Sequence, residues 1–174
     1  ARQLVETPFG RGFEVLMGGG RKNFMPVTQR DPEEDDKVGE RLDGRDLITD
    51  WKRRHPGGVY AWNKAQLDAA PLDKPLLALF QPDHMQFEYE RPKDVAGEPS
   101  LAEMTRAAIA RLSRDQDGYV LLVEGGRIDH ANHYGNAYRA LSDTVAMSDA
   151  VRAATEATSP DDTLIIVTAD HSHV

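Results

Sequence analysis

Carboxylate and imidazole side chains gather in two short stretches of this sequence. They are Glu124, Asp129 and His133 in VEGGRIDHANH, and Asp170 and His171 in TADHSHV. In a helix, Asp129 and His133 would share one face, because residues four apart have Cβ atoms about 5–6 Å from each other. Carboxylate oxygens and imidazole nitrogens bind divalent cations, and five candidate ligands exceed what one tetrahedral zinc ion needs. The pattern therefore predicts more than one metal ion.

Each part of the pattern also has an ordinary structural interpretation. An Asp-His pair at the end of a strand is common in loops, and an i, i+4 pair is common on a solvated helix face. Glu124 has Arg127 nearby as a salt-bridge partner. The metal interpretation is favoured because all these residues follow apolar segments of the same kind.

Those segments are two continuous apolar runs, YVLLV at 119–123 and TLIIV at 163–167. Such runs predict strands covered on both faces of a parallel sheet. Glu124 follows the first run and Asp170 follows the second. Since ligands of open α/β sheets bind at the carboxyl ends of strands, we expect these side chains to converge at one edge.

The rest of the chain predicts alternating helices and strands. Ser100 and Glu103 have the spacing of a capping box and open a helix to about residue 114. A second helical pattern covers about 132–158. Further strands are predicted at FEVLM (13–17), GVYAW (58–62) and LLALF (76–80). The fold class is therefore α/β, with a mostly parallel central sheet flanked by helices.

Composition narrows the classes of function. The 174 residues carry a net charge of −8, which disfavours nucleic acid as a partner. No cysteine is present, so neither disulfides nor thiolate metal sites can form. No apolar run approaches the ~20 residues of a membrane span, and no signal peptide is visible.

The sequence resembles the alkaline phosphatases, most closely the animal-type branch with a calcium-binding region. Besides the two metal stretches, the similar segments are GGGRKNFMP, RLDGRDLI, AWNKAQL, LLALFQP and SLAEMTRAAI. The resemblance covers almost the whole chain. It implies one partial α/β domain over 1–174, truncated at both ends, with a metal-binding, irregular insertion at 26–99.

The resemblance implies a role for each candidate ligand. Asp129 and His133 match ligands of a first zinc ion, whose third ligand would lie beyond Val174. Asp170 and His171 match ligands of a second zinc ion, and Glu124 matches the carboxylate of a magnesium site.

Three neighbouring residues also correspond to family positions. His130 matches a residue near the bound phosphate, and His173 matches a histidine near the site that is not a direct ligand. Asn132 replaces a histidine common in the animal enzymes. The alternative for His130 and His173 is that they are merely exposed polar residues.

The resemblance also implies a calcium site at Glu33, Phe80 and Glu98. The family has a Phe-Glu pair where this chain has Phe80-Gln81, so one carboxylate is lost. Fewer charged ligands predict weaker calcium binding.

The implied activity is hydrolysis of phosphate monoesters through a phosphoserine. The nucleophilic serine would lie upstream of Ala1, so we expect these 174 residues alone to be inactive. The resemblance further implies a full-length homodimer, exported to the periplasm or the extracellular space. Two alternatives stay open: another metal-dependent phosphoesterase or sulfatase, and an inactive metal-binding fragment.

Overall fold

The computed structural model describes residues 1–173 except residues 9 and 11. Val174, the last residue of the second metal stretch, lies outside the described residues. The chain divides into two compact units. We call Ala1–Met85 with Val95–Glu98 the sheet unit, and Gln86–Asp94 with the residues from Pro99 onward the helical unit.

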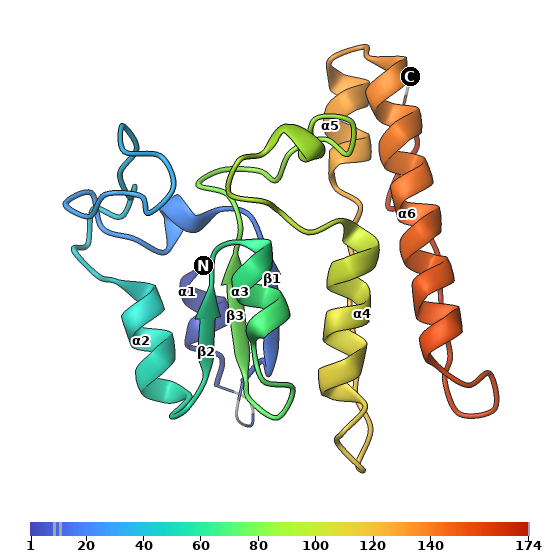
Figure 1. Cartoon of the computed structure of the whole chain (residues 1–174), viewed down its shortest axis with the longest axis horizontal. Coiled ribbons are helices and arrows are strands. Elements are labelled where there is room, and N and C mark those ends of the chain that lie inside the picture. Colours follow the sequence, from blue (N-terminus) through green and yellow to red (C-terminus); the bar gives the residue numbers. More distant parts are fainter. Residues whose placement is uncertain (9, 11, 174) are drawn as a thin grey trace. The chain divides into compact units, whose positions relative to one another are not determined.

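The sheet unit is built on three parallel strands. They are β1 (Val15–Gly18), β2 (Val59–Ala61) and β3 (Leu76–Leu79), in the order β1-β3-β2 (Figure 1). Leu76 pairs with Val15 on one side and with Val59 on the other. The predicted strands at 13–17, 58–62 and 76–80 therefore form: β2 and β3 are slightly shorter than predicted, and β1 begins two residues later and ends one residue later. This parallel sheet with flanking helices confirms the predicted fold class.

The central strand β3 is apolar throughout because it has neighbours on both edges and on its faces. All four of its residues are buried. Strands buried on both faces have continuous apolar sequences of this kind. The LLALF pattern was thus a reliable signal for the middle of the sheet.

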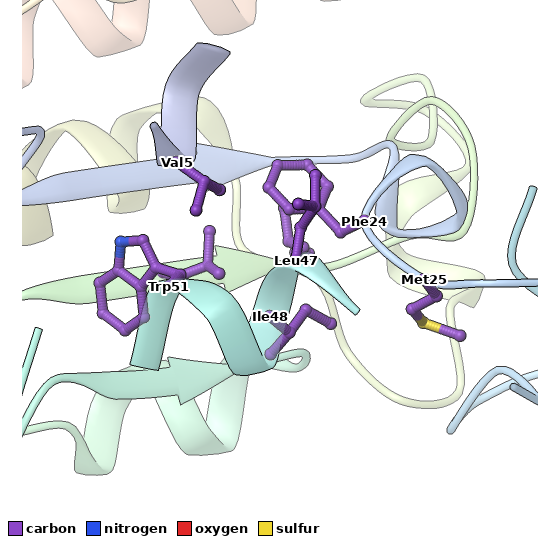
Figure 2. Packing of buried hydrophobic residues seen from close by; sticks show 8 residues of the cluster. Val5, Phe24, Met25, Leu47, Ile48 and Trp51 are labelled. Atoms are coloured by element: carbon purple, nitrogen blue, oxygen red, sulfur yellow. The ribbon is translucent and has the colours of Figure 1, made fainter. Parts of the chain in front are cut away.

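Two helices cover the sheet unit's main core. α1 (Arg2–Val5) contributes one buried side chain, and α2 (Leu47–Arg54) contributes three apolar ones. Figure 2 shows this packing around Trp51, which is fully buried. The cluster comprises Val5, Phe24, Met25, Leu47, Ile48, Trp51, Leu77 and Leu79.

Side-chain caps define where two of the sheet unit's helices begin. Asp46 accepts hydrogen bonds from the backbone N–H groups of Ile48 and Thr49 at the start of α2. Asn63 accepts one from Gln66 at the start of α3 (Lys64–Ala69). These contacts satisfy N–H groups that have no partner inside the helix.

The helical unit contains α4 (Leu101–Leu112), α5 (Arg127–His133) and α6 (Ala137–Ala157). α4 and α6 lie side by side (Figure 1). The predicted capping box is confirmed: Glu103 N–H donates to Ser100 Oγ at 3.2 Å, and Ser100 N–H donates to Glu103 at 2.8 Å. The predicted helix at 132–158 is divided, because Gly135 adopts a φ of 61° between α5 and α6.

The two strands predicted in the helical unit are absent from the described residues. Runs 119–123 and 163–167 precede the metal stretches as expected, but neither forms a ladder with a neighbouring strand. Several of their apolar side chains are exposed, with Val120 at 97% and Leu164 at 84%, and none of the others is fully buried. The prediction that both are buried strands is therefore wrong for this structure. A strand needs a paired neighbour, and sequence alone did not reveal that these runs lack one here.

Helix length and polarity bear on membrane association. Among the described residues, no helix is both long enough and apolar enough to cross a bilayer. α6 is the longest helix at 21 residues, and it carries charged residues along its length.

Candidate metal centre

The helix α5 carries the first part of the candidate site. Asp129 and His133 share one face, and Asp129 Oδ2 lies 3.4 Å from His133 Nε2. The i, i+4 spacing read from the sequence therefore produces the expected side-chain pair. The carboxylate is partly exposed and the imidazole more so, which leaves both accessible to an ion from solvent.

The C-terminal stretch supplies the second part. His171 Nε2 lies 3.6 Å from Asp129 Oδ1, and His173 Nε2 lies 3.9 Å from the same oxygen. The rings of His133 and His173 meet edge to face, with centroids 4.6 Å apart. Residues 40 or so positions apart in sequence thus meet around Asp129.

Three residues offer ligand atoms close enough to hold one ion. One atom each from Asp129, His133 and His173 lies within 4.8 Å of the others. Asp129 Oδ1 is inaccessible to solvent and has no hydrogen-bond partner. A buried carboxylate oxygen without a partner is costly unless something compensates it. One acidic and two imidazole donors suit a divalent cation such as zinc, so the residues present fit the implied metal.

His173 was expected near the site, not among its ligands. The structure places it in the cluster with Asp129 and His133. A signal for this was present in the sequence: His171 and His173 alternate, and alternate residues of an extended chain point to the same side. Both imidazoles consequently reach Asp129.

The electrostatics of His171 follow from its carboxylate and carbonyl neighbours. Its Nδ1 lies 2.9 Å from the carbonyl oxygen of Ser172, and Asp170 and Asp129 are close to its Nε2. The Ser172 carbonyl and, after it, the negative charge of Asp170 raise the pKa of His171 above its ordinary value. Binding of a metal to this imidazole therefore competes with protons.

The other two predicted ligands, Asp170 and Glu124, lie outside the cluster around Asp129. Asp170 is 91% exposed, and its Oδ1 accepts the N–H of His171. Glu124 is exposed just before α5, and it contributes no atom to the described three-residue cluster. Its Oε1 lies 3.0 Å from where a Cβ at Gly126 would be, so the glycine leaves room for this carboxylate.

His130 and Asn132 complete α5. His130 Nδ1 lies 2.9 Å from Arg127 Nη1. Asn132 donates from its side-chain amide to the carbonyl oxygen of Ile128 at 2.9 Å. Asn132, which the resemblance places at the position of a family histidine, is therefore bonded to its own helix.

The predicted calcium residues all lie in the sheet unit. Glu33 accepts from Arg21 Nη2 at 2.7 Å, so its carboxylate already has a cationic partner. Phe80 follows β3 and is 1% exposed, and Glu98 is 3% exposed. Gln81, expected from the resemblance to stand in place of a glutamate, is also buried. Arg21 reaches Asp31 as well, so the acidic run at 31–36 is in part a partner of this arginine.

Comparison with known proteins decides the family. The sequence profile described as alkaline phosphatase matches residues 1–174, the whole chain. The chain belongs to the alkaline phosphatase family. The resemblance inferred from the sequence motifs is thereby confirmed.

Relatives and solved structures agree with this assignment. The chain is 44% identical over its full length to the membrane-bound alkaline phosphatase of Bombyx mori, and 44% identical to the tissue-nonspecific isozyme of Gallus gallus. It covers 32% and 34% of those proteins. The crystal structure of Thermus thermophilus alkaline phosphatase matches 81% of the chain with a TM-score of 0.67 and 35% identity, and 26% of that protein is covered. The chain thus spans about a third of the length of its curated relatives.

Proposed function

We propose that this chain is part of a longer phosphoric monoester hydrolase and supplies several of that enzyme's metal ligands. The observation that carries the proposal is the convergence on Asp129 of imidazoles from two separate segments, in a chain of the alkaline phosphatase family. Asp129 Oδ1 accepts no hydrogen bond, and the nitrogens of His171 and His173 approach it only to 3.6 and 3.9 Å, which favours a cation bound between these groups.

The proposed ions are two zinc ions and one magnesium ion. Asp129 and His133 would hold the first zinc ion, with a further ligand from outside this chain. Asp170 and His171 would hold the second, and Glu124 the magnesium ion. When bound, such ions stabilise negative charge on the oxygens of the phosphoryl group and of the groups that attack and leave it.

The side chains of this chain have distinct tasks under the proposal. Asp129 and the surrounding imidazoles would bind the cations and so place positive charge beside the phosphate. His130 would offer a ring nitrogen to a phosphate oxygen, directly or through water. The nucleophilic serine and the phosphate-gripping arginine would come from outside the 174 residues. The chain alone should therefore not hydrolyse phosphate esters.

The test uses the full-length protein that contains this chain. Asp129→Asn and His133→Ala should each lower kcat/KM for p-nitrophenyl phosphate by at least about 100-fold, since even neighbours of metal ligands typically contribute about 10–100-fold. Both variants should also lose bound zinc, measured by elemental analysis. His84→Ala is the matched control, because His84 is an exposed imidazole in the sheet unit and should leave both values unchanged.

Chelation gives an independent arm of the same test. Removing the metal should abolish turnover, and adding zinc and magnesium should restore it. Full activity after exhaustive chelation, or full zinc content in Asp129→Asn, would contradict the proposal. Metal binding without turnover in the full-length protein would favour a non-enzymatic module instead.

A sulfatase or another metal-dependent phosphoesterase is the remaining alternative. A substrate panel of p-nitrophenyl phosphate, a phosphodiester analogue and p-nitrophenyl sulfate separates these activities. We expect the monoester to be hydrolysed fastest. Faster hydrolysis of the sulfate or the diester would identify the alternative.

Calcium, assembly and export also belong to the proposal. The calcium ion would lie by Glu33, Phe80 and Glu98, with weak affinity, because Arg21 holds Glu33 and Gln81 carries no charge. The insertion at 26–99 contains these residues. The full-length protein is proposed to be a homodimer that acts in the periplasm or outside the cell.

A further inference from the structure

The helix that carries the site is too short to hold its own position. α5 has seven residues, and its N-cap, Gly126, makes no side-chain capping bond. Isolated helices shorter than ~12–15 residues are marginal in water. The orientation of Asp129, His130 and His133 must therefore come from what α5 packs against.

Phe87 provides that support from within the helical unit. This residue is 5% exposed, and it packs with Ala131 of α5 and Ala140 of α6. The guanidinium carbon of Arg127, the first residue of α5, lies 3.6 Å from the centroid of the Phe87 ring. Stacking of an arginine on an aromatic face is favourable and fixes the plane of the guanidinium group.

The fixed guanidinium group then bonds to His130. Arg127 Nη1 lies 2.9 Å from His130 Nδ1. An arginine has only donors, so Nδ1 of His130 must accept and cannot carry a hydrogen. A neutral imidazole with an accepting Nδ1 carries its hydrogen on Nε2.

We propose that Arg127, braced on Phe87, is a positioning residue that fixes the ring of His130 with Nε2–H as a hydrogen-bond donor. The role of that donor rests on the proposed function, where it would face a phosphate oxygen or a water bound to it. A donor at a preset position favours an anionic ligand without reorganisation. Arg127 thus acts through His130 and does not itself touch the substrate.

Arg139 provides a control for the loss of stacking on Phe87. Its guanidinium carbon lies 4.5 Å from the centroid of the same Phe87 ring. Its hydrogen bonds, however, go to Glu90 Oε1 at 3.0 and 2.7 Å. Loss of Arg139 removes a comparable stacking contact and leaves the bond between Arg127 and His130 in place.

The first experiment reads the tautomer directly and needs no activity. In the full-length protein labelled with 15N-histidine, the signal of His130 is assigned by its loss in His130→Ala. We expect an unprotonated Nδ1 and a protonated Nε2 in the wild type and in Arg127→Lys, which keeps a donor. Arg127→Met should give a mixture of tautomers. Protonated Nδ1 in the wild type, or an unchanged spectrum in Arg127→Met, overturns the proposal.

The second experiment is a double-mutant cycle on hydrolysis of p-nitrophenyl phosphate. Arg127→Met should lower kcat/KM about tenfold, in the range typical of residues that orient a direct contact. In the His130→Ala background the same change should cost less than about twofold, because the residue through which it acts is gone. Arg139→Met should stay within about twofold of the wild type.

The outcomes of the two experiments are separable. An equal loss from Arg127→Met in both backgrounds, or a matching loss from Arg139→Met, makes Arg127 merely structural and overturns the proposal. A full-length wild type without phosphatase activity refutes the proposed function. The tautomer measurement then still decides whether Arg127 sets the ring of His130.

Discussion

The buried Arg21 organises the loop that follows β1. The Arg21 side chain has no exposed surface, and it donates to both oxygens of Asp31, to Glu33 and to the carbonyl oxygen of Leu79. The Asp31 side chain is 1% exposed. Because the charges lie out of water, each partner depends on the other for compensation.

Removing one partner of this pair should destabilise the protein strongly. We expect Asp31→Asn to lower the free energy of unfolding by about 3 kcal/mol, since it removes the more deeply buried of the two carboxylates that compensate the Arg21 guanidinium. Chemical denaturation of the full-length protein measures the change. Asp68→Asn is the matched control, because its ion pair with Lys64 is exposed and should contribute little. Equal stability of the two variants would show that Arg21 is compensated in another way.

Asp31 also predicts that the free energy of unfolding decreases at acidic pH. Burial raises the pKa of Asp31, but the hydrogen bonds from Arg21 and from the Glu33 backbone outweigh it, so the pKa lies below the ordinary 3.8. A carboxyl with a depressed pKa in the folded state stabilises fully above its unfolded value, and this contribution is lost as the pH falls through the folded value. Asp31→Asn should therefore flatten the decline of stability below about pH 4.

Asp143 predicts the opposite dependence of stability on pH. Burial raises the pKa of the Asp143 carboxyl, so its ionised form is disfavoured in the folded protein. Its contribution to stability is present at low pH and is lost as the pH rises through the folded pKa. Thermal unfolding measured across pH should show that Asp31→Asn weakens the loss of stability at low pH, whereas Asp143→Asn weakens the loss of stability as the pH rises. Parallel changes would contradict the assignment.

At the scale of elements, α4 owes its start to a capping box. Ser100 and Glu103 each accept a backbone N–H of the other. Ser100→Ala should cost about 1 kcal/mol in the free energy of unfolding, the usual contribution of an N-cap serine. Ser113→Ala at the other end of α4 is the control and should change stability by less than about 0.5 kcal/mol, as exposed substitutions do. A larger effect at Ser113 would mean that the C-terminal end limits this helix.

Elements with local signals were predictable from the sequence. The capping box of α4, the apolar β3 and the helical spacing of Asp129 and His133 depend on neighbours within a few residues. The runs 119–123 and 163–167 have the composition of buried strands, but their state depends on a distant partner strand. The alternation of His171 and His173 predicts that both imidazoles point to the same side, but their approach to Asp129 depends on a long-range contact with α5. The bonding of Glu33 to Arg21 likewise depends on a tertiary contact.

At the scale of the whole molecule, the exposed apolar runs at 119–123 and 163–167 indicate where further strands of the full-length protein would pair. Val120, Leu122, Leu164 and Ile166 are between 76% and 97% exposed. Proteins rarely leave adjacent apolar side chains in water, and unpaired extended runs readily pair with other chains. Since the curated relatives are about three times as long, we expect these runs to be paired strands in the full-length protein.

The isolated 174-residue chain should therefore self-associate, whereas the full-length protein should not form aggregates beyond its native assembly. Light scattering and binding of a dye specific for exposed apolar surface measure the difference. Lysine at Val120 and Ile166 should reduce association of the isolated chain, because charge on an open edge opposes pairing. In the full-length protein, the same V120K and I166K changes should lower stability sharply, because a lysine would then be buried without a partner. A monomeric isolated chain that binds no dye, together with a full-length protein that tolerates both lysines, would show that these runs stay exposed in the native molecule.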